Sequence, residues 1–140
     1  MKKAILTIDN SKAISYVFNT MFEKDYEVTS VQNFSEAINH LQSTPSNDLM
    51  IIDIPDADSE NLEFLEHIST SSIFRNIPKV VISKSDDQQL KNRSVQLGAS
   101  LFITKPFDPV YLSGKVQDLI YENGKKSIIK KRRSFNLNIF

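Results

Sequence analysis

The 140-residue sequence contains no cysteine. This absence excludes disulfide bonds, zinc sites built from thiolates and catalysis by a cysteine nucleophile, and it suits a reducing cytoplasm. Long apolar runs are missing too, because no stretch approaches the roughly 18 residues that a bilayer-spanning helix needs. We therefore expect no membrane span. No signal peptide is expected either, since Asp9 and Asn10 interrupt the first apolar stretch early.

Acidic residues are missing from the C-terminal end of the chain. The whole sequence has 17 acids and 17 bases, so its formal net charge is zero. Every acid lies at or before Glu122, whereas residues 124–140 carry six of the bases, which leaves residues 1–123 with 11 bases and a net charge of −6. Because domains most often run to about 100–150 residues, we predict one domain over residues 1–123 and a basic tail over residues 124–140.

The apolar residues predict strands and helices in alternation. Four short apolar runs, and one alternating segment at residues 26–31 that predicts a half-buried strand, are each followed by a segment with apolar residues at helical spacing. Uninterrupted apolar strands indicate that both faces of the sheet are covered, and crossovers through helices make the strands parallel. The predicted fold class is therefore α/β, a single doubly wound (βα)5 domain with a five-stranded parallel sheet. The expected strands are residues 4–8, 26–31, 49–52, 80–82 and 101–103.

Each helix is expected to bury one apolar stripe. Asn33 or Ser35 is expected to cap the second helix, and Gly98 to end the fourth. The stripe of the first helix is Ile14, Val17, Phe18, Met21 and Phe22, and that of the last helix is Val110, Leu112, Val116, Leu119 and Ile120.

Polar residues follow four of the five predicted strands. The first strand is followed by Asp9 and Asn10, the third by Asp53, the fourth by Ser83 and the fifth by Lys105. In a parallel sheet these strand ends lie at one edge, where doubly wound folds bind their ligands. Oxygen ligands without histidine or cysteine suit a hard cation such as Mg2+. A carboxylate beside such a cation and an ammonium group can attack phosphorus as a nucleophile.

These residues give the chain a resemblance to the receiver domain of two-component response regulators, of the CheY-like type. The resemblance extends from residue 3 to about residue 122. Its landmarks stand at the family's spacing and at the ends of the predicted strands. They are Asp9-Asn10 at the acidic pair, Asp53 at the phosphoacceptor, Ser83 at the hydroxyl position, Lys105 at the lysine before proline, Phe102 at the aromatic switch position, and Gly98-Ala99 before the fifth strand.

The resemblance implies a phosphorelay signalling module. Asp53 would receive a phosphoryl group from a histidine kinase or phosphotransfer protein. Mg2+ would be held by Asp9, Asn10, Asp53 and the backbone carbonyl of Pro55. In this interpretation the protein is not an enzyme beyond catalysing its own phosphorylation and hydrolysis, and it is a cytoplasmic protein of bacterial type.

The same resemblance implies a conformational switch. Lys105 and Ser83 would hold the phosphoryl oxygens, and an inward movement of Ser83 would draw Phe102 inward. The surface formed by the fourth helix, fourth strand and fifth helix would then change its shape for a downstream protein target. The residues alone leave two alternatives open, because Ser83 also suits a helix cap and Phe102 also suits an ordinary core position.

Five residues depart from the family pattern. Asn10 replaces a carboxylate, so Mg2+ should bind more weakly. Pro55 offers no backbone N–H, and Ala57 replaces the usual proline. Asn61 replaces a glycine and is expected to keep a left-handed turn, which asparagine tolerates. Lys84 replaces a small residue and either narrows access to Asp53 or adds a cation to the pocket.

Other classes of function are weighed against the phosphorelay module. The first is a pseudo-receiver that serves as a protein-interaction scaffold without phosphorylation, as Asn10, Pro55 and Lys84 suggest. The second is a small phosphate-ester hydrolase, which is disfavoured because a second lid domain is missing. The third is a flavodoxin-like cofactor carrier, which is disfavoured because no Ser/Thr/Gly-rich phosphate loop follows the first strand.

The basic tail has three interpretations. It extends the last helix as an amphipathic partner-binding element, it forms an arm that contacts an acidic surface or nucleic acid, or it adds an edge strand through the alternating residues 135–139. Its charge suits docking on the acidic body of this chain or of a second copy, which would form a homodimer. At 17 residues and without a helix-turn-helix, it predicts no sequence-specific binding to nucleic acid.

Overall fold

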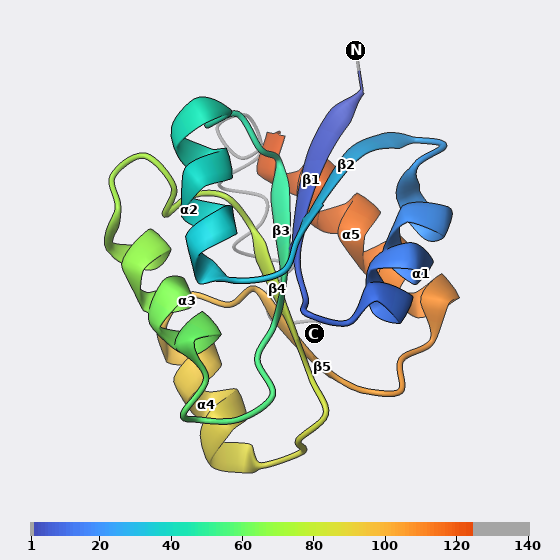
Figure 1. Cartoon of the computed structure of the whole chain (residues 1–140). Coiled ribbons are helices and arrows are strands. Elements are labelled where there is room, and N and C mark those ends of the chain that lie inside the picture. The colour runs from blue at the N-terminus through green and yellow to red at the C-terminus, as the bar shows by residue number, and fades with distance from the viewer. Residues whose placement is uncertain (1, 125–140) are drawn as a thin grey trace, which may run out of the picture.

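Five strands alternate with five helices in the computed structural model, which describes residues 2–124 (Figure 1). The strands are β1 Lys3–Ile8, β2 Tyr26–Val31, β3 Leu49–Asp53, β4 Lys79–Ser83 and β5 Leu101–Thr104. The helices are α1 Lys12–Phe22, α2 Phe34–Ser43, α3 Glu60–Thr70, α4 Gln88–Gln96 and α5 Pro109–Gly124. Among the described residues, no helix is long and apolar enough to cross a membrane. The three interpretations of the tail concern residues outside the described part of the chain.

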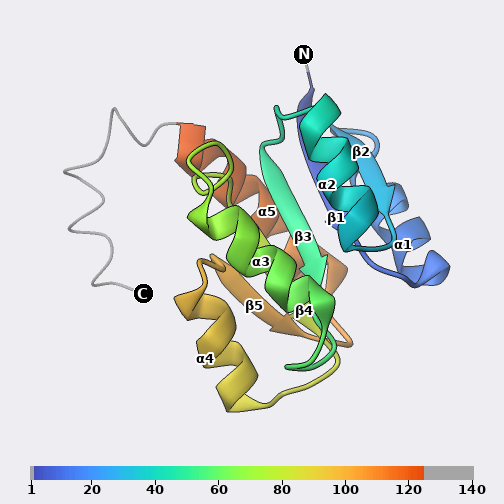
Figure 2. The ribbon, with the colours of Figure 1, turned by 60° about the vertical axis from the view of Figure 1, so that its left-hand side comes forward.

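The strands form one parallel sheet in the order β2-β1-β3-β4-β5. Helices α1 and α5 cover one face, and α2, α3 and α4 cover the other (Figures 1 and 2). The chain therefore moves outward from β1 to β2 and then returns past β1 to β3, which places a topological switch point between β1 and β3. The predicted doubly wound α/β fold is confirmed.

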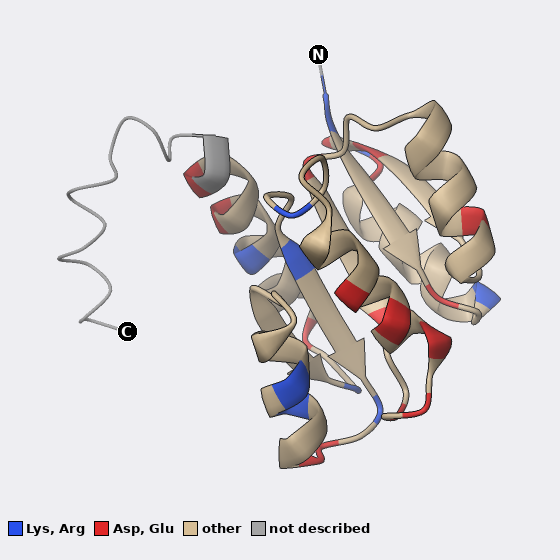
Figure 3. Cartoon of the chain, turned by 90° about the vertical axis from the view of Figure 1, so that its left-hand side faces the viewer, with Lys and Arg blue, Asp and Glu red and all other residues tan. Residues whose placement is uncertain are grey.

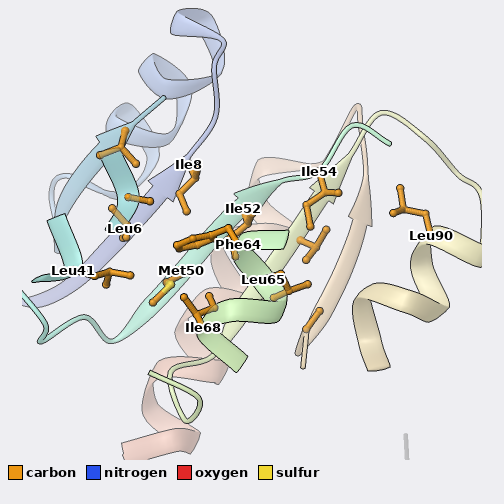
Figure 4. Packing of buried hydrophobic residues seen from close by; sticks show 14 residues of the cluster. Leu6, Ile8, Leu41, Met50, Ile52, Ile54, Phe64, Leu65, Ile68 and Leu90 are labelled. Carbon is orange, nitrogen blue, oxygen red and sulfur yellow. The ribbon is translucent and has the colours of Figure 1, made fainter. Parts of the chain in front are cut away.

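Both faces of the sheet are buried under apolar side chains. On the α2–α3–α4 side, residues of β1 and β3 such as Leu6 and Ile52 pack against Phe64 and its neighbours on α3 (Figure 4). On the α1–α5 side, alternate residues of the same strands pack against Phe18 and Val116. Because successive side chains of a strand point to opposite faces, burial of both faces accounts for the uninterrupted apolar runs in the sequence.

Local side chains fix the helix ends. Each cap residue of α1 to α4 accepts a hydrogen bond from a backbone N–H in the first turn of its helix, which satisfies an otherwise unpaired donor. Gly98 follows α4 with a φ of +106°, a left-handed conformation that glycine adopts without strain. The prediction that Gly98 ends the fourth helix is therefore confirmed. The four caps are Ser11, Asn33, Ser59 and Asp87.

Two predicted core positions are wrong. Val110 is 80% exposed and Val17 is 38% exposed. The buried stripe of α5 contains Leu112, Val116 and Ile120, and Val110 is two residues before it, about 200° around the helix at 3.6 residues per turn. Both valines were predicted in the core because their side chains are apolar. Neither lies on the buried face of its helix.

Acidic residues of the body gather along α3 and the loop before it (Figure 3). Asp56, Asp58, Glu60 and Glu63 are all exposed there. Asp9 and Asp53 differ from them because both are buried. The negative charge of the body therefore divides into a surface part and a buried pair at the carboxyl edge of the sheet.

Candidate functional site

One ammonium group contacts two buried carboxylates at the carboxyl edge of the sheet. The Nζ atom of Lys105 is 3.0 Å from Oδ1 of Asp53 and 3.3 Å from Oδ2 of Asp9. The side chain of Asp9 is 1% exposed, that of Asp53 is 11% exposed and that of Lys105 is 22% exposed. Three residues that are distant in the sequence are thus brought together, as the order of the strands predicts.

Backbone contacts hold the two carboxylates in place. The N–H of Asp9 donates to the carbonyl of Val31 at the end of β2, at 3.1 Å. Oδ1 of Asp9 accepts from the N–H of Ser11 at 2.8 Å, which leaves Oδ2 for Lys105. The backbone carbonyl of Asp53 accepts from Nδ2 of Asn61 at 2.8 Å. A backbone N–H therefore holds the carboxylate of Asp9, and Asn61 holds the backbone that carries the carboxylate of Asp53.

The pKa values of the central pair reflect burial and charge. Burial raises the pKa of the Asp53 carboxyl, and the hydrogen bond from Lys105 opposes this rise; the nearby Asp9 charge adds to it, and the charges of Lys105 and Lys84 reduce it. Burial alone lowers the pKa of the Lys105 ammonium, but its interactions with Asp53 and Asp9 outweigh that effect and raise the pKa overall. Lys105 therefore remains a cation, and Asp53 is more basic than an ordinary aspartate.

Ser83 lies fully buried at the end of β4, beside the carboxylate pair. Its carbonyl accepts from the N–H of Lys105 at 2.7 Å, which joins the ends of β4 and β5. Its Oγ accepts from the N–H of Ser85 at 3.1 Å, so the hydroxyl hydrogen is left to donate. Asp87 caps α4, so the alternative that Ser83 caps this helix is wrong.

A pocket of about 230 Å3 opens beside Asp53. It brings Asn10 and Pro55 together with Asp53, as the predicted metal site requires. Lys84 is exposed and is not among the residues that line this pocket. The lining residues are Asn10, Gln32, Asn33, Asp53, Pro55, Ser59, Glu60 and Asn61.

The donors at this edge suit a hard cation in kind. Asp9 and Asp53 supply carboxylates, Asn10 supplies an amide oxygen and Pro55 supplies a backbone carbonyl, all of which are oxygen ligands that Mg2+ accepts. Within residues 2–124 there is no group of three or more His, Cys, Asp or Glu residues that could hold a metal. Asn10 agrees with this finding. A carboxylate at position 10 would make three acidic residues at this edge with Asp9 and Asp53, whereas the amide leaves only two.

Phe102 lies half-buried on β5 and packs against the apolar cluster on the α2–α3–α4 side of the sheet. This contact agrees with the interpretation of Phe102 as a core residue. Its register also places it next to Val81 on β4, two residues before Ser83. A coupled movement of Ser83 and Phe102 stays a prediction.

Asn61 has a different role from the one its sequence position suggested. It is the second residue of α3, and no residue other than glycine has a positive φ in the described part of the chain, so the expected left-handed turn is wrong. Its side chain is buried and contacts the backbone of Asp53. No pattern of residues predicts this contact, because an asparagine after a helix cap ordinarily faces solvent.

A doubly wound (βα)5 sheet with paired carboxylates and a lysine at its carboxyl edge defines the receiver class of signalling module. The model of the response regulator receiver domain matches residues 5–117, and the chain belongs to this family, a component of two-component signalling.

Individual relatives agree with this assignment. The chain is 25% identical to the phosphate regulon transcriptional regulatory protein PhoB of Escherichia coli over 118 residues, which are 84% of this chain and 51% of that protein. It is 31% identical to the sensory transduction protein BceR of Halalkalibacterium halodurans over 120 residues, which are 86% of this chain and 50% of that protein. The chain thus spans about half the length of these curated relatives.

The fold is also found in solved structures. A CheY-like receiver domain protein from Methanospirillum hungatei superposes with a TM-score of 0.81 at 24% identity, covering 90% of this chain and 99% of that one. At this identity the likeness concerns the fold.

Proposed function

We propose that Asp53 is the phosphoacceptor of a phosphorelay. The observation that carries this proposal is the contact of Lys105 with both Asp53 and Asp9 at the sheet edge. The ammonium offsets the charge of two carboxylates that would otherwise repel each other and an incoming phosphoryl group. The donor would be a phosphohistidine on a histidine kinase or phosphotransfer protein, which is the partner that membership of the family suggests.

The proposed transfer is a single displacement at phosphorus. A carboxylate oxygen of Asp53 forms the new O–P bond, and the P–N bond to the histidine ring breaks. The electron pair of that bond leaves with the imidazole nitrogen, which takes up a proton from water. Lys105 and the hydroxyl hydrogen of Ser83 would donate to the phosphoryl oxygens and stabilise their charge. The chain would act on itself only, so we do not propose an enzyme in the usual sense.

We propose that Mg2+ occupies the edge of the sheet between Asp9, Asn10, Asp53 and the carbonyl of Pro55. The ion would neutralise negative charge that gathers on the phosphoryl group during transfer. The residues themselves orient the site, because Asp9 is held by its hydrogen bond from Ser11 and Asp53 by that from Asn61.

The output would be a changed protein-interaction surface. Ser83 lies on β4 beside β5, and Phe102 lies on β5 under α4 and its neighbours. A phosphoryl group that pulls on the Ser83 hydroxyl would act on a packed layer, in which small shifts pass to neighbouring side chains. We propose a downstream protein as the target and a cytoplasmic location.

Phosphorylation can be tested directly. Incubation of the protein with Mg2+ and acetyl phosphate should add one phosphoryl mass, measured on the intact protein. Asp53→Ala should abolish this addition, because the attacking oxygen is gone. Asp58→Ala, which removes an exposed acid from the same loop, is the matched control and should be phosphorylated like the wild type. Mass addition that persists in Asp53→Ala would contradict the proposal.

Asn10 favours a second candidate, a pseudo-receiver that acts as a protein-interaction scaffold. An amide at this position removes one negative charge from the metal site, and without Mg2+ phosphoryl transfer would be slow. A wild-type protein that folds, binds no Mg2+ at millimolar concentration and gains no mass from acetyl phosphate would support this alternative.

Asn10→Asp should tighten Mg2+ binding by about tenfold or more. The added carboxylate supplies a full charge close to the cation, and such pairs are worth on the order of 1–4 kcal/mol near a protein surface. Asn10 is exposed, so the fold should tolerate the change. Titration with Mg2+ followed by amide chemical shifts measures the affinity. Asn39→Asp adds the same charge at an exposed site on α2 and should have little effect; an equal gain in both variants would argue against Asn10 as a ligand position.

A further inference from the structure

The side chain of Asn61 holds a buried hydrogen-bond acceptor that has no donor within residues 2–124. The residue is 8% exposed. Its Nδ2 atom donates to the carbonyl of Asp53 at 2.8 Å, whereas its Oδ1 atom is buried and accepts no hydrogen bond from the described residues. Burial of an unpaired amide oxygen costs folding free energy, because the oxygen loses its hydrogen bonds to water. An acceptor kept in this state needs an explanation.

Asn61 lines the pocket beside Asp53, and this pocket has a surplus of acceptors. Two of its oxygens are already used, since Oδ1 of Asn33 caps α2 and Oγ of Ser59 caps α3. Oδ1 of Asp53 contacts Lys105, so the acceptors that remain are its Oδ2 atom and the unpaired oxygen of Asn61, together with the carboxylate of Glu60 and the amide oxygens of Asn10 and Gln32. No lysine or arginine is among the lining residues of this pocket.

The chemistry of the lining residues selects the kind of ligand. Without a bound cation, an anion would meet two carboxylates and an amide oxygen and would be repelled, so a phosphoryl group can approach Asp53 only after a cation has bound. A ligand that donates hydrogen bonds and carries positive charge would satisfy all three. Mg2+ gives up its water reluctantly and usually keeps several bound molecules, each of which is a strong donor. A hydrated magnesium ion therefore has both properties that the pocket lacks.

We propose that Asn61 is a positioning residue for the hydrated metal. Its Oδ1 accepts a hydrogen bond from a water molecule bound to Mg2+, while its Nδ2 holds the backbone of Asp53. The proposal rests on the proposed function, because it concerns the same metal. It adds a contact outside the direct ligands, which compensates in part for the weaker metal binding expected from Asn10.

Two substitutions at this position separate the proposed role from a structural one. Asn61→Ala removes both the acceptor and the contact with Asp53, so Mg2+ should bind roughly three- to tenfold more weakly, the loss expected for one hydrogen bond. Asn61→Asp loses the donor to Asp53 but keeps an acceptor and adds a negative charge, so Mg2+ should bind as tightly as in the wild type or more tightly. Affinity is measured by Mg2+ titration followed by amide chemical shifts.

A purely structural Asn61 predicts a different pattern. The affinity gained from Asn61→Ala to Asn61→Asp would then be no larger than the gain from wild type to Gln32→Glu, which adds the same charge at another lining residue of the pocket, and this result would overturn the proposal. Equal affinity in wild type and Asn61→Ala would overturn it too. If the wild type itself binds no Mg2+, the metal part of the proposed function fails and this inference fails with it. If the wild type binds Mg2+ and both variants bind it with the same affinity, only this inference is rejected.

Thermal unfolding with and without Mg2+ gives a second measurement for destabilised variants. Mg2+ should raise the Tm of the wild type and of Asn61→Asp, and should raise that of Asn61→Ala by less. Ser94→Ala is the matched control, since Oγ of Ser94 is also buried and has no partner in the described part of the chain, but it lies on α4, outside the pocket. It should leave the Mg2+-dependent shift unchanged. A shift in Asn61→Ala as large as in the wild type would contradict the proposal.

Discussion

Lys105→Met should destabilise the protein by roughly 3 kcal/mol at neutral pH and reduce phosphoryl uptake at Asp53 by about 100-fold or more. Removal of one partner from a buried ion pair commonly costs about 3–5 kcal/mol, and the partial exposure of Lys105 places the effect at the low end. Loss of one donor to a developing charge typically costs about 10²–10³ in rate. Chemical denaturation and the rate of mass gain from acetyl phosphate measure the two effects.

The stability of Lys105→Met should also depend on pH in a defined direction. Without the ammonium, the pKa of the Asp53 carboxyl should rise above the already raised value of the wild type. A carboxyl with a raised pKa destabilises the fold when it is ionised, and the penalty disappears as the pH falls below the pKa of the unfolded chain, about 4. The deficit relative to the wild type should therefore shrink from pH 7 toward pH 4.

Lys84→Met is the matched control for this substitution. Lys84 is exposed and influences Asp53 only through its charge, without a direct contact. It should change stability by no more than about 0.5 kcal/mol, the usual range for surface substitutions. Equal effects of the two methionine variants, or a Lys105→Met deficit that grows as the pH falls, would refute the central role of Lys105.

Lys79→Met should stabilise the protein by about 2–3 kcal/mol at pH 7. Lys79 is 1% exposed at the start of β4, and its Nζ donates to the carbonyl of Arg75 at 2.8 Å. Burial lowers the pKa of this ammonium from 10.5 to about 8. At about 1.4 kcal/mol for each pKa unit, the charged form costs about 3 kcal/mol, and loss of the hydrogen bond offsets part of the gain. Chemical denaturation across pH measures the difference.

The pH dependence of this gain follows from the lowered pKa. Between about pH 8 and 10.5 the folded protein releases the Lys79 proton while the unfolded chain keeps it, so wild-type stability rises with pH in this window. The advantage of Lys79→Met should therefore diminish as the pH rises. Lys91→Met, at an exposed site on α4, should show no such trend. A destabilised Lys79→Met at pH 7 would show that Lys79 contributes more by contact than it costs by burial.

The architecture could be predicted from the sequence because two periodicities are present at once. Uninterrupted apolar runs identified buried strands, and three- and four-residue spacings identified the helices between them. Once the strands are parallel, their C-terminal ends must share an edge, so Asp9, Asp53, Ser83 and Lys105 had to converge. The structure gives this convergence its geometry, and the match over residues 5–117 gives it a family.

Other features could not be predicted because they depend on the direction of individual side chains. Asn61 was expected in a left-handed turn, but it lies in α3 and contacts the backbone of Asp53. Val110 was expected in the core, but the buried stripe of α5 faces the opposite direction. Each residue turns a helix by about 100°, so an error of one position moves a residue from the buried face to the exposed one. The pattern of apolar residues therefore locates the buried face only approximately, and the packing in the structure is needed to define it.

The sequence by itself determined the order of strands and helices, the separation of an acidic body from a basic tail, and the residues that end the strands. These properties follow from local patterns and from the rules that connect parallel strands. Only the tertiary structure decided that one lysine contacts both carboxylates, that Lys79 is buried, and that Asn61 keeps an unpaired oxygen beside Asp53. Burial and pairing are relations between segments that are distant in the sequence, so no local pattern of residues contains them.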